Sequence, residues 1–211
     1  MIVCYTHGLV YLAPPKTGSS SLRRILMNPP FNGDIQPKGK HAHHGFKWDE
    51  DWKDFFFFIT VRHPYPRMYS LWRMMCNELQ KNLDGEWAHP TLGAWLKHHF
   101  KSPPTLDQFM AHRKFKHAFE AVWRCSWQLE QLPKSVHGTV IRLERYYDDL
   151  KKVPQLQGVD VGHVNQRTDD WPRWSEVLTD KHCEKIQELW GEDFVRFNYN
   201  RKRKAVITLG R

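Results

Sequence analysis

Residues 11–22 read Tyr-Leu-Ala-Pro-Pro-Lys-Thr-Gly-Ser-Ser-Ser-Leu, and this stretch decides how the chain folds. A short apolar run ends at two prolines, and Lys16, Gly18 and a helix-like segment follow. This order predicts a strand, a tight turn and the N-terminus of a helix. Backbone N–H groups and the helix dipole attract an anion at such a terminus, and Lys16 adds a full positive charge. From this segment alone, a helix start capped by a serine is the alternative.

The turn differs from the loop that binds nucleoside triphosphates. That loop carries its lysine directly after its last glycine, in the pattern G-x-x-x-x-G-K-[ST]. Here Lys16 precedes Gly18, and the first glycine of the pattern is absent. The segment therefore indicates an anion site without the spacing of a triphosphate loop.

A second anion signal lies at residues 54–62, which read Asp-Phe-Phe-Phe-Phe-Ile-Thr-Val-Arg. The unbroken aromatic and β-branched run is typical of a strand buried on both faces of a parallel sheet. Ligands of open α/β sheets bind at the carboxyl ends of strands, so Arg62 leaves the sheet where a ligand is expected. Ser70 follows eight residues later, on the first turns of the next predicted helix. An arginine can bind a phosphate with two parallel hydrogen bonds.

Strands and helices are expected to alternate along the chain. Strands are predicted over 1–5, 8–12, 55–61 and 139–143, and helices over 20–27, 66–83, 145–152 and 175–190. Thr105 and Gln108 have the spacing of a capping box, which predicts a further helix start. The alternation predicts an α/β fold with a central parallel sheet, in a single domain over residues 1–211.

Together, the two anion signals resemble the paired signature of sulfotransferases that use 3′-phosphoadenosine 5′-phosphosulfate (PAPS). The first part of the signature matches residues 15–22, Pro-Lys-Thr-Gly-Ser-Ser-Ser-Leu. The second part matches residues 61–72, Val-Arg-His-Pro-Tyr-Pro-Arg-Met-Tyr-Ser-Leu-Trp. Residues 140–150 and the Gly-His-Val-Asn-Gln-Arg segment at 162–167 are similar to segments of the carbohydrate-type branch. The resemblance spans about residues 10–199 and implies a P-loop-like, three-layer α/β/α fold.

The resemblance also implies roles for individual residues. The first loop is expected to hold the 5′-phosphosulfate with the side chains and N–H groups of Lys16, Thr17, Gly18, Ser19, Ser20 and Ser21. Arg62 and Ser70 are expected to hold the 3′-phosphate. Lys16 is expected to stabilise the leaving phosphate during in-line transfer, and Arg167 to close over the cofactor.

The base that takes the proton of the acceptor hydroxyl is expected among the histidines of Lys40-His41-Ala42-His43-His44. Relatives carry a catalytic histidine between the two cofactor motifs, and histidine titrates near neutrality. His41, which follows a lysine as in many relatives, is preferred, and His43 is the alternative. The carboxylates of Asp49 and Glu50 are weaker candidates. A solvated or metal-binding cluster is the other interpretation, but the sequence places no third ligand for zinc, so no metal is expected.

Composition limits the partners and the compartment. The chain has 211 residues and a formal net charge of +9, which suits a polyanionic cofactor or an acidic glycan. No RNA-binding motif, zinc finger or basic helical stripe points to nucleic acid. The four cysteines lie far apart, which favours free thiols. No signal peptide or membrane span is recognisable, so a cytoplasmic protein of microbial or viral origin is expected.

The sequence therefore predicts an enzyme that moves the sulfuryl group of PAPS to an acceptor hydroxyl, leaving PAP. The expected acceptor is a carbohydrate, which the basic chain allows to be anionic. Two alternatives stay open: a P-loop-type kinase for a small molecule, and a non-catalytic module that binds a nucleotide or polyanion. Magnesium dependence separates the kinase, and a Lys16→Ala variant that binds without turnover separates the module.

Overall fold

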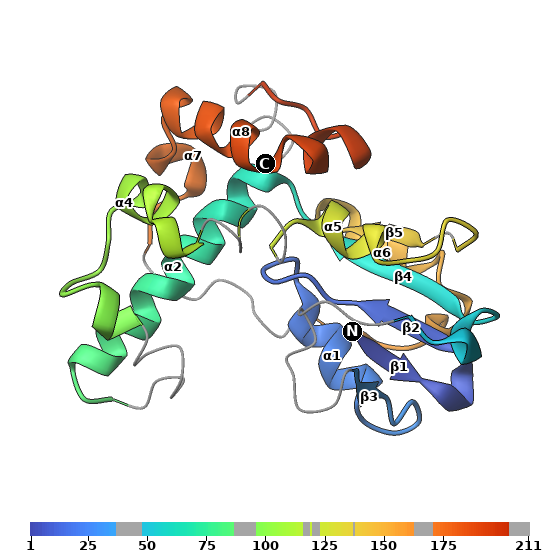
Figure 1. The fold of residues 1–211 in the computed structure, drawn as a ribbon. Coiled ribbons are helices and arrows are strands. Elements are labelled where there is room, and N and C mark those ends of the chain that lie inside the picture. Colours follow the sequence, from blue (N-terminus) through green and yellow to red (C-terminus); the bar gives the residue numbers. More distant parts are fainter. Residues whose placement is uncertain are drawn as a thin grey trace.

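The fold is a mixed α/β arrangement built on one five-stranded sheet, shown by the computed structural model (Figure 1). The structure describes residues 1–36, 48–86, 96–115, 119, 123–136, 138–162 and 171–202. The strands are β1 (Ile2–Cys4), β2 (Leu9–Leu12), β3 (Asp34–Ile35), β4 (Phe56–Val61) and β5 (Thr139–Arg142). The helices are α1 (Ser19–Leu26), α2 (Pro64–Leu83), α4 (Leu106–Ala111), α5 (Cys125–Glu130), α6 (Tyr146–Leu150), α7 (Trp174–Val177) and α8 (Asp180–Arg196).

The strand order is β3-β1-β2-β4-β5, and only part of the sheet is parallel. β2, β4 and β5 run parallel to one another, as the sequence predicted for the centre of the sheet. β1 pairs antiparallel with both β2 and β3. A short helical turn at Tyr5–His7 and Gly8, with a φ of 54°, reverse the chain between β1 and β2. The sheet is therefore mixed: its centre is parallel as predicted, and β1 and β3 add an antiparallel edge.

Both faces of the sheet are buried, because alternate residues of each strand enter different apolar clusters. Phe58 of β4 belongs to the cluster that contains residues of α1 and α6. Its neighbours Phe57 and Ile59 belong to the cluster with Trp52 and α5 residues. The predicted unbroken strand is thus confirmed by burial on both sides. The three-layer P-loop-like arrangement and the single domain over 1–211 stay predictions.

A third apolar cluster forms beside the sheet, around α2. This helix begins directly after β4 and extends away from the sheet, with α4, α7 and α8 next to it (Figure 1). The cluster joins residues such as Met68 and Leu79 of α2 to Ile186 and Trp190 of α8. The core is therefore divided between the sheet and this helical part.

Two local predictions had different outcomes in the helical part. The capping box is confirmed, because the Thr105 hydroxyl accepts from Gln108 N and the Gln108 side chain accepts from Thr105 N. The single helix over 175–190 is wrong, since α7 ends at Val177 and α8 begins at Asp180. Thr179 separates them, and its hydroxyl accepts the His182 N–H at 3.3 Å. A side chain that caps a new helix here ends the continuity that apolar periodicity suggested.

His63 connects the end of β4 to the start of α2. Its Nδ1 accepts the Tyr65 N–H at 3.3 Å, which caps α2, and its Nε2–H donates to Asn200 O at 2.9 Å. This pair of bonds requires the neutral ring. Burial, assisted by the neighbouring Arg62 charge and opposed by the Asn200 bond, lowers the pKa of His63 from 6.5 to about 4. The folded state therefore holds His63 neutral at pH values where the unfolded chain protonates it.

We expect His63 to make the protein less stable in acid. Its contribution is complete above pH 6.5 and is lost as the pH falls to about 4. Between pH 7 and 4.5 the wild-type free energy of unfolding should fall by about 2–3 kcal/mol more than that of His63→Asn. Urea unfolding at the two pH values measures this difference. The exposed His98 provides the control, because His98→Asn should follow the wild type; equal losses in all three proteins would contradict the account.

Candidate anion-binding site

The two predicted anion signals meet at one edge of the sheet. β2 and β4 are parallel neighbours, with Leu12 opposite Ile59. Lys16 lies four residues beyond Leu12, and Arg62 three residues beyond Ile59. Both side chains therefore follow the carboxyl ends of adjacent parallel strands, where α/β sheets bind ligands.

The turn after β2 is fixed by a chain of buried hydroxyl groups. The Thr17 hydroxyl donates to Pro14 O at 2.8 Å, so the Thr60 hydroxyl donates to Thr17 Oγ1 at 2.8 Å. The Tyr11 hydroxyl in turn donates to Thr60 Oγ1 at 2.7 Å. Thr60, the polar residue within the apolar run of β4, thus ties the turn to the sheet. Because the Thr17 hydroxyl donates its proton inside the turn, it has no proton left to donate to a ligand.

The backbone of the turn is strained where a ligand is expected. Lys16 has a φ of 64° and Gly18 a φ of 78°. The left-handed region costs a lysine about 1–3 kcal/mol and persists where the surroundings enforce it, commonly at binding sites. Gly18 is the N-cap of α1, and no side chain caps this helix. The proposed serine N-cap is therefore wrong, and Ser19, Ser20 and Ser21 form the first turn of α1.

Arg62 lies beside a network that includes Glu144, a residue of the third matched segment. Glu144 Oε1 accepts the His63 N–H at 2.7 Å, and its Oε2 accepts the Tyr199 hydroxyl at 3.1 Å. Burial lowers the pKa of Arg62, and the negative charge of Glu144 opposes this effect. Ser70 is half-buried on α2, which begins two residues after Arg62. The structure thus explains why a carboxylate follows β5: it fixes the backbone next to Arg62.

Positive charge is concentrated at this edge of the sheet. Burial, and then the charges of Arg62 and Arg73, lower the pKa of Lys16. Among the residues that the structure describes, no ion pair or side-chain hydrogen bond neutralises Lys16 or Arg62. Lys16, Arg62 and Arg73 lie close enough to affect one another, and the carboxylate of Glu144 acts on Arg62. Such a group of cations fits a ligand with several negative charges. The residues present therefore fit a polyphosphorylated cofactor such as PAPS.

Arg73 is a member of this group that sequence reasoning missed. Its guanidinium carbon lies 4.9 Å from the centre of the Trp171 ring and 5.7 Å from that of Tyr69. Arg73 follows Ser70 by three residues in α2 and therefore shares its helical face. The spacing of three residues after Ser70 could have identified Arg73 from the sequence.

Several candidates lie elsewhere or outside the described part of the chain. His41, His43 and Arg167 fall in ranges that the structure does not describe. Asp49 caps a short helical turn at Glu50–Trp52, and Glu50 accepts the Trp48 indole N–H at 2.9 Å. Trp48 stacks on Phe57, the second residue of β4. Asp49 and Glu50 thus belong to the amino end of β4, whereas Arg62 follows its carboxyl end.

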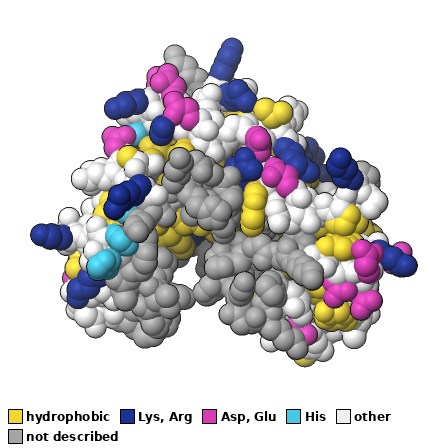
Figure 2. Space-filling model, in the orientation of Figure 1, with side chains coloured by type: hydrophobic (Ala, Val, Ile, Leu, Met, Phe, Trp, Pro, Cys, Tyr) yellow, Lys and Arg dark blue, Asp and Glu magenta, His cyan; other side chains and the backbone are white. Residues whose placement is uncertain are grey.

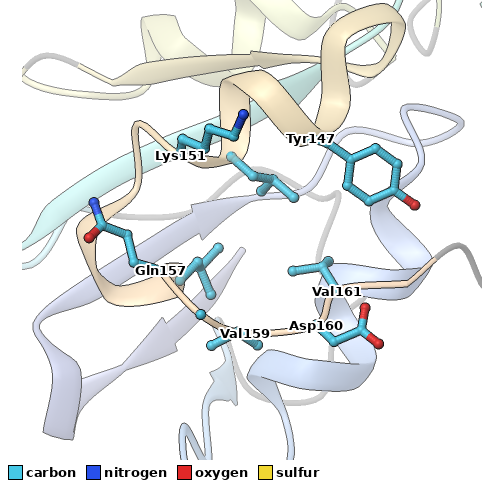
Figure 3. Close-up of a pocket in the computed structure, with 9 residues that line it drawn as sticks. Tyr147, Lys151, Gln157, Val159, Asp160 and Val161 are labelled. Atoms are coloured by element: carbon cyan, nitrogen blue, oxygen red, sulfur yellow. The ribbon is translucent and has the colours of Figure 1, made fainter.

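A cavity of about 360 Å³ lies away from these cations, beside α6 (Figure 3). Figure 3 shows Tyr147, Lys151, Gln157 and Val161 around it, and none of the anion-site residues lines it. The distribution of surface charge does not indicate another anion site, because basic and acidic side chains are interspersed on the described part of the face in Figure 2. Convergent chemistry at the strand ends therefore defines the candidate site.

Comparison with known families agrees with this geometry. The sequence model described as Sulfotransferase family matches residues 1–200. The chain belongs to the sulfotransferase family. No match was found among curated proteins or among solved structures. Sulfotransferase membership supports sulfuryl transfer as the activity and implies an acceptor with a hydroxyl group. None of the helices that the structure describes has the length and apolarity needed to cross a bilayer.

We expect Gly18→Ala to be more destabilising than its backbone angle alone explains. A Cβ at Gly18 would lie 2.5 Å from Leu143 Cδ1, whereas one at Gly158, with the same φ of 78°, meets nothing within 4 Å. Gly158→Ala should cost about 1–2 kcal/mol for the left-handed backbone. Gly18→Ala should lower the free energy of unfolding by up to about 1 kcal/mol more, because the end of the Leu143 side chain must move. Urea unfolding of both variants tests this, and equal losses would show that Leu143 does not pack on Gly18.

Proposed function

We propose that this chain transfers the sulfuryl group of PAPS to a hydroxyl group of a carbohydrate. The observation that carries the proposal is the convergence of Lys16 and Arg62 beyond the paired ends of β2 and β4. Each follows a strand in the order found in the sulfotransferase signature. Burial, and then the charges of Arg62 and Arg73, lower the pKa of Lys16, and an anionic donor relieves this penalty on the charged form.

The described residues divide the work of binding between two places. The turn at Lys16, with the uncapped N-terminus of α1, offers a cation and backbone N–H groups to the 5′-phosphosulfate. Arg62, with Ser70, offers a guanidinium and a hydroxyl to the 3′-phosphate. Thr17, Gly18, Ser19, Ser20 and Ser21 complete the cradle at the first place. When bound, PAPS supplies an activated sulfuryl group, and PAP is the product.

Lys16 has the role closest to the chemistry. Negative charge grows on the leaving phosphate as the sulfuryl group departs, and a fixed ammonium stabilises that charge more in the transition state than before it. Lys16 has a strained backbone and lies two residues before Gly18, the N-cap of α1, where no side chain caps the helix. His41, or His43 in its place, is proposed as the base for the acceptor hydroxyl, and Arg167 as a cover of the cofactor.

The carbohydrate acceptor is proposed from the third and fourth matched segments, residues 140–150 and 162–167. In the described part of these segments, Asp149 accepts the Arg142 N–H at 2.9 Å and Glu144 accepts the His63 N–H at 2.7 Å. Asp149 thus joins α6 to β5, and Glu144 joins the turn between them to His63. The net charge of +9 favours an acceptor that is itself anionic.

Calorimetric titration with PAP tests the donor directly. We expect PAP to bind the wild type, and Arg62→Ala to weaken binding about 10- to 100-fold, because a charged hydrogen-bonding partner is lost. Arg24→Ala, which removes an exposed arginine of α1, should leave the affinity unchanged. A titration with ATP and Mg²⁺ serves as the second control. A failure to bind PAP, or a preference for ATP with Mg²⁺, would favour a kinase or another nucleotide-binding protein.

A further inference from the structure

The loop that carries Lys16 is attached to a buried arginine of α2. Arg67 Nε donates to Pro15 O at 3.1 Å, and Pro15 directly precedes Lys16. Arg67 is 1% exposed, so its side chain is enclosed by protein. The Nη2 group donates to Trp123 O, and the guanidinium lies 4.7 Å from the centre of the Trp190 ring. Arg67 is thus fixed on several sides and unable to turn toward a ligand.

The partner of Arg67 is Asp193, near the end of α8. Arg67 Nη1 donates to Asp193 Oδ2 at 3.0 Å, and the two side chains are 1% and 2% exposed. The same carboxylate accepts the N–H groups of Cys125 at 2.9 Å and Ser126 at 2.8 Å. These are the first two residues of α5. Asp193 therefore fixes the N-terminus of α5 while it holds Arg67.

The other half of the anion site is attached to the pair through the start of α2. The Arg67 N–H donates to His63 O at 3.1 Å, and His63 directly follows Arg62. The side chain of Arg67 therefore reaches Pro15 and the Lys16 turn, and its backbone holds the segment that carries Arg62. Arg67 also lies in α2, five residues after Arg62. Both cation-bearing segments are thus fastened to one buried pair of charges.

We propose that the Arg67–Asp193 ion pair is a positioning pair that sets the separation between Lys16 and Arg62. A fixed separation makes the site selective for a ligand with two anionic groups at matching distance, in preference to one with a single phosphate. This inference rests on the proposed function, because it takes the ligand to be a nucleoside bisphosphate. The pair itself touches neither anionic group.

The physical basis is that the two phosphates of one ligand bind to two linked sites. Once one phosphate is bound, the second binds as an intramolecular event, which raises affinity only where the two sites match the ligand's span. Displacement by about 1 Å can cost a positioned contact about 100-fold. Loosening the ion pair should therefore weaken a bisphosphate strongly, while a monophosphate, which uses one site at a time, changes little.

The test compares three nucleotides on one set of variants. Dissociation constants for PAP, 5′-AMP and 3′-AMP are measured with the wild type and with Arg67→Lys, which keeps the charge but cannot keep all of its hydrogen bonds. We expect PAP to weaken about 10- to 100-fold and each monophosphate to change less than about threefold. Should Arg67→Lys fail to fold, Asp193→Asn, which keeps one acceptor oxygen for α5, gives the same readout.

A variant of the same helix separates positioning from general destabilisation. Leu79→Ala removes a fully buried side chain of α2 that belongs to the helical cluster. It should lower stability and leave the ratio of PAP to AMP affinity unchanged. If Arg67→Lys also leaves that ratio unchanged, the positioning proposal is wrong although the proposed function stands. If the wild type binds PAP no tighter than AMP, the proposed donor itself is wrong.

Discussion

The buried contact between Arg67 and Asp193 joins the sheet to the helices that surround α2. The Nη1–Oδ2 distance is 3.0 Å, and both side chains are buried. Removing one partner of such a pair leaves an uncompensated buried charge, which typically costs about 3–5 kcal/mol. The carboxylate also accepts hydrogen bonds from the start of α5, and the guanidinium also donates to Pro15 O. Loss of the pair would therefore disturb four segments: α2, α8, α5 and the turn at Pro15. The pair thus fixes the positions of α8 and α5 relative to the turn between β2 and α1.

The contrast between Arg67 and the cations of the site separates structural from ligand-binding charge. Arg67 has a carboxylate, two carbonyl groups and an aromatic ring around its guanidinium. The pKa of Lys16 is instead lowered, first by burial and then by the charges of Arg62 and Arg73. It also occupies a left-handed backbone conformation. A strained backbone and neighbouring positive charges destabilise the free protein at this residue. Both are typical of a binding site whose ligand supplies the negative charge.

Sequence alone predicted the elements whose signals are local. The aromatic run predicted β4, the Pro-Pro-Lys-Thr-Gly order predicted the turn before α1, and the capping pair Thr105 and Gln108 predicted α4. The paired motifs predicted that Lys16 and Arg62 would meet, because parallel strands bring their carboxyl ends to the same edge. Family membership over residues 1–200 confirms the resemblance to sulfotransferases.

What sequence did not predict depends on contacts between distant segments or on very short elements. Arg67 and Asp193 are separated by 126 positions, and no pattern links them. β3 has only two residues, so pairing with β1 rather than propensity makes it a strand. The break before Asp180 needs the cap that Thr179 provides. His41, His43 and Arg167 stay predictions, because they lie outside the described residues.

The most direct test of the account follows the two phosphorus atoms of PAP separately. Phosphorus NMR resolves the 3′- and 5′-phosphates, and both resonances should shift when PAP binds the wild type. Arg62→Ala should reduce the change at the 3′-phosphate, and Lys16→Met the change at the 5′-phosphate. If neither resonance shifts with the wild type, or if both variants affect the two phosphates alike, Lys16 and Arg62 do not form the two halves of one donor site.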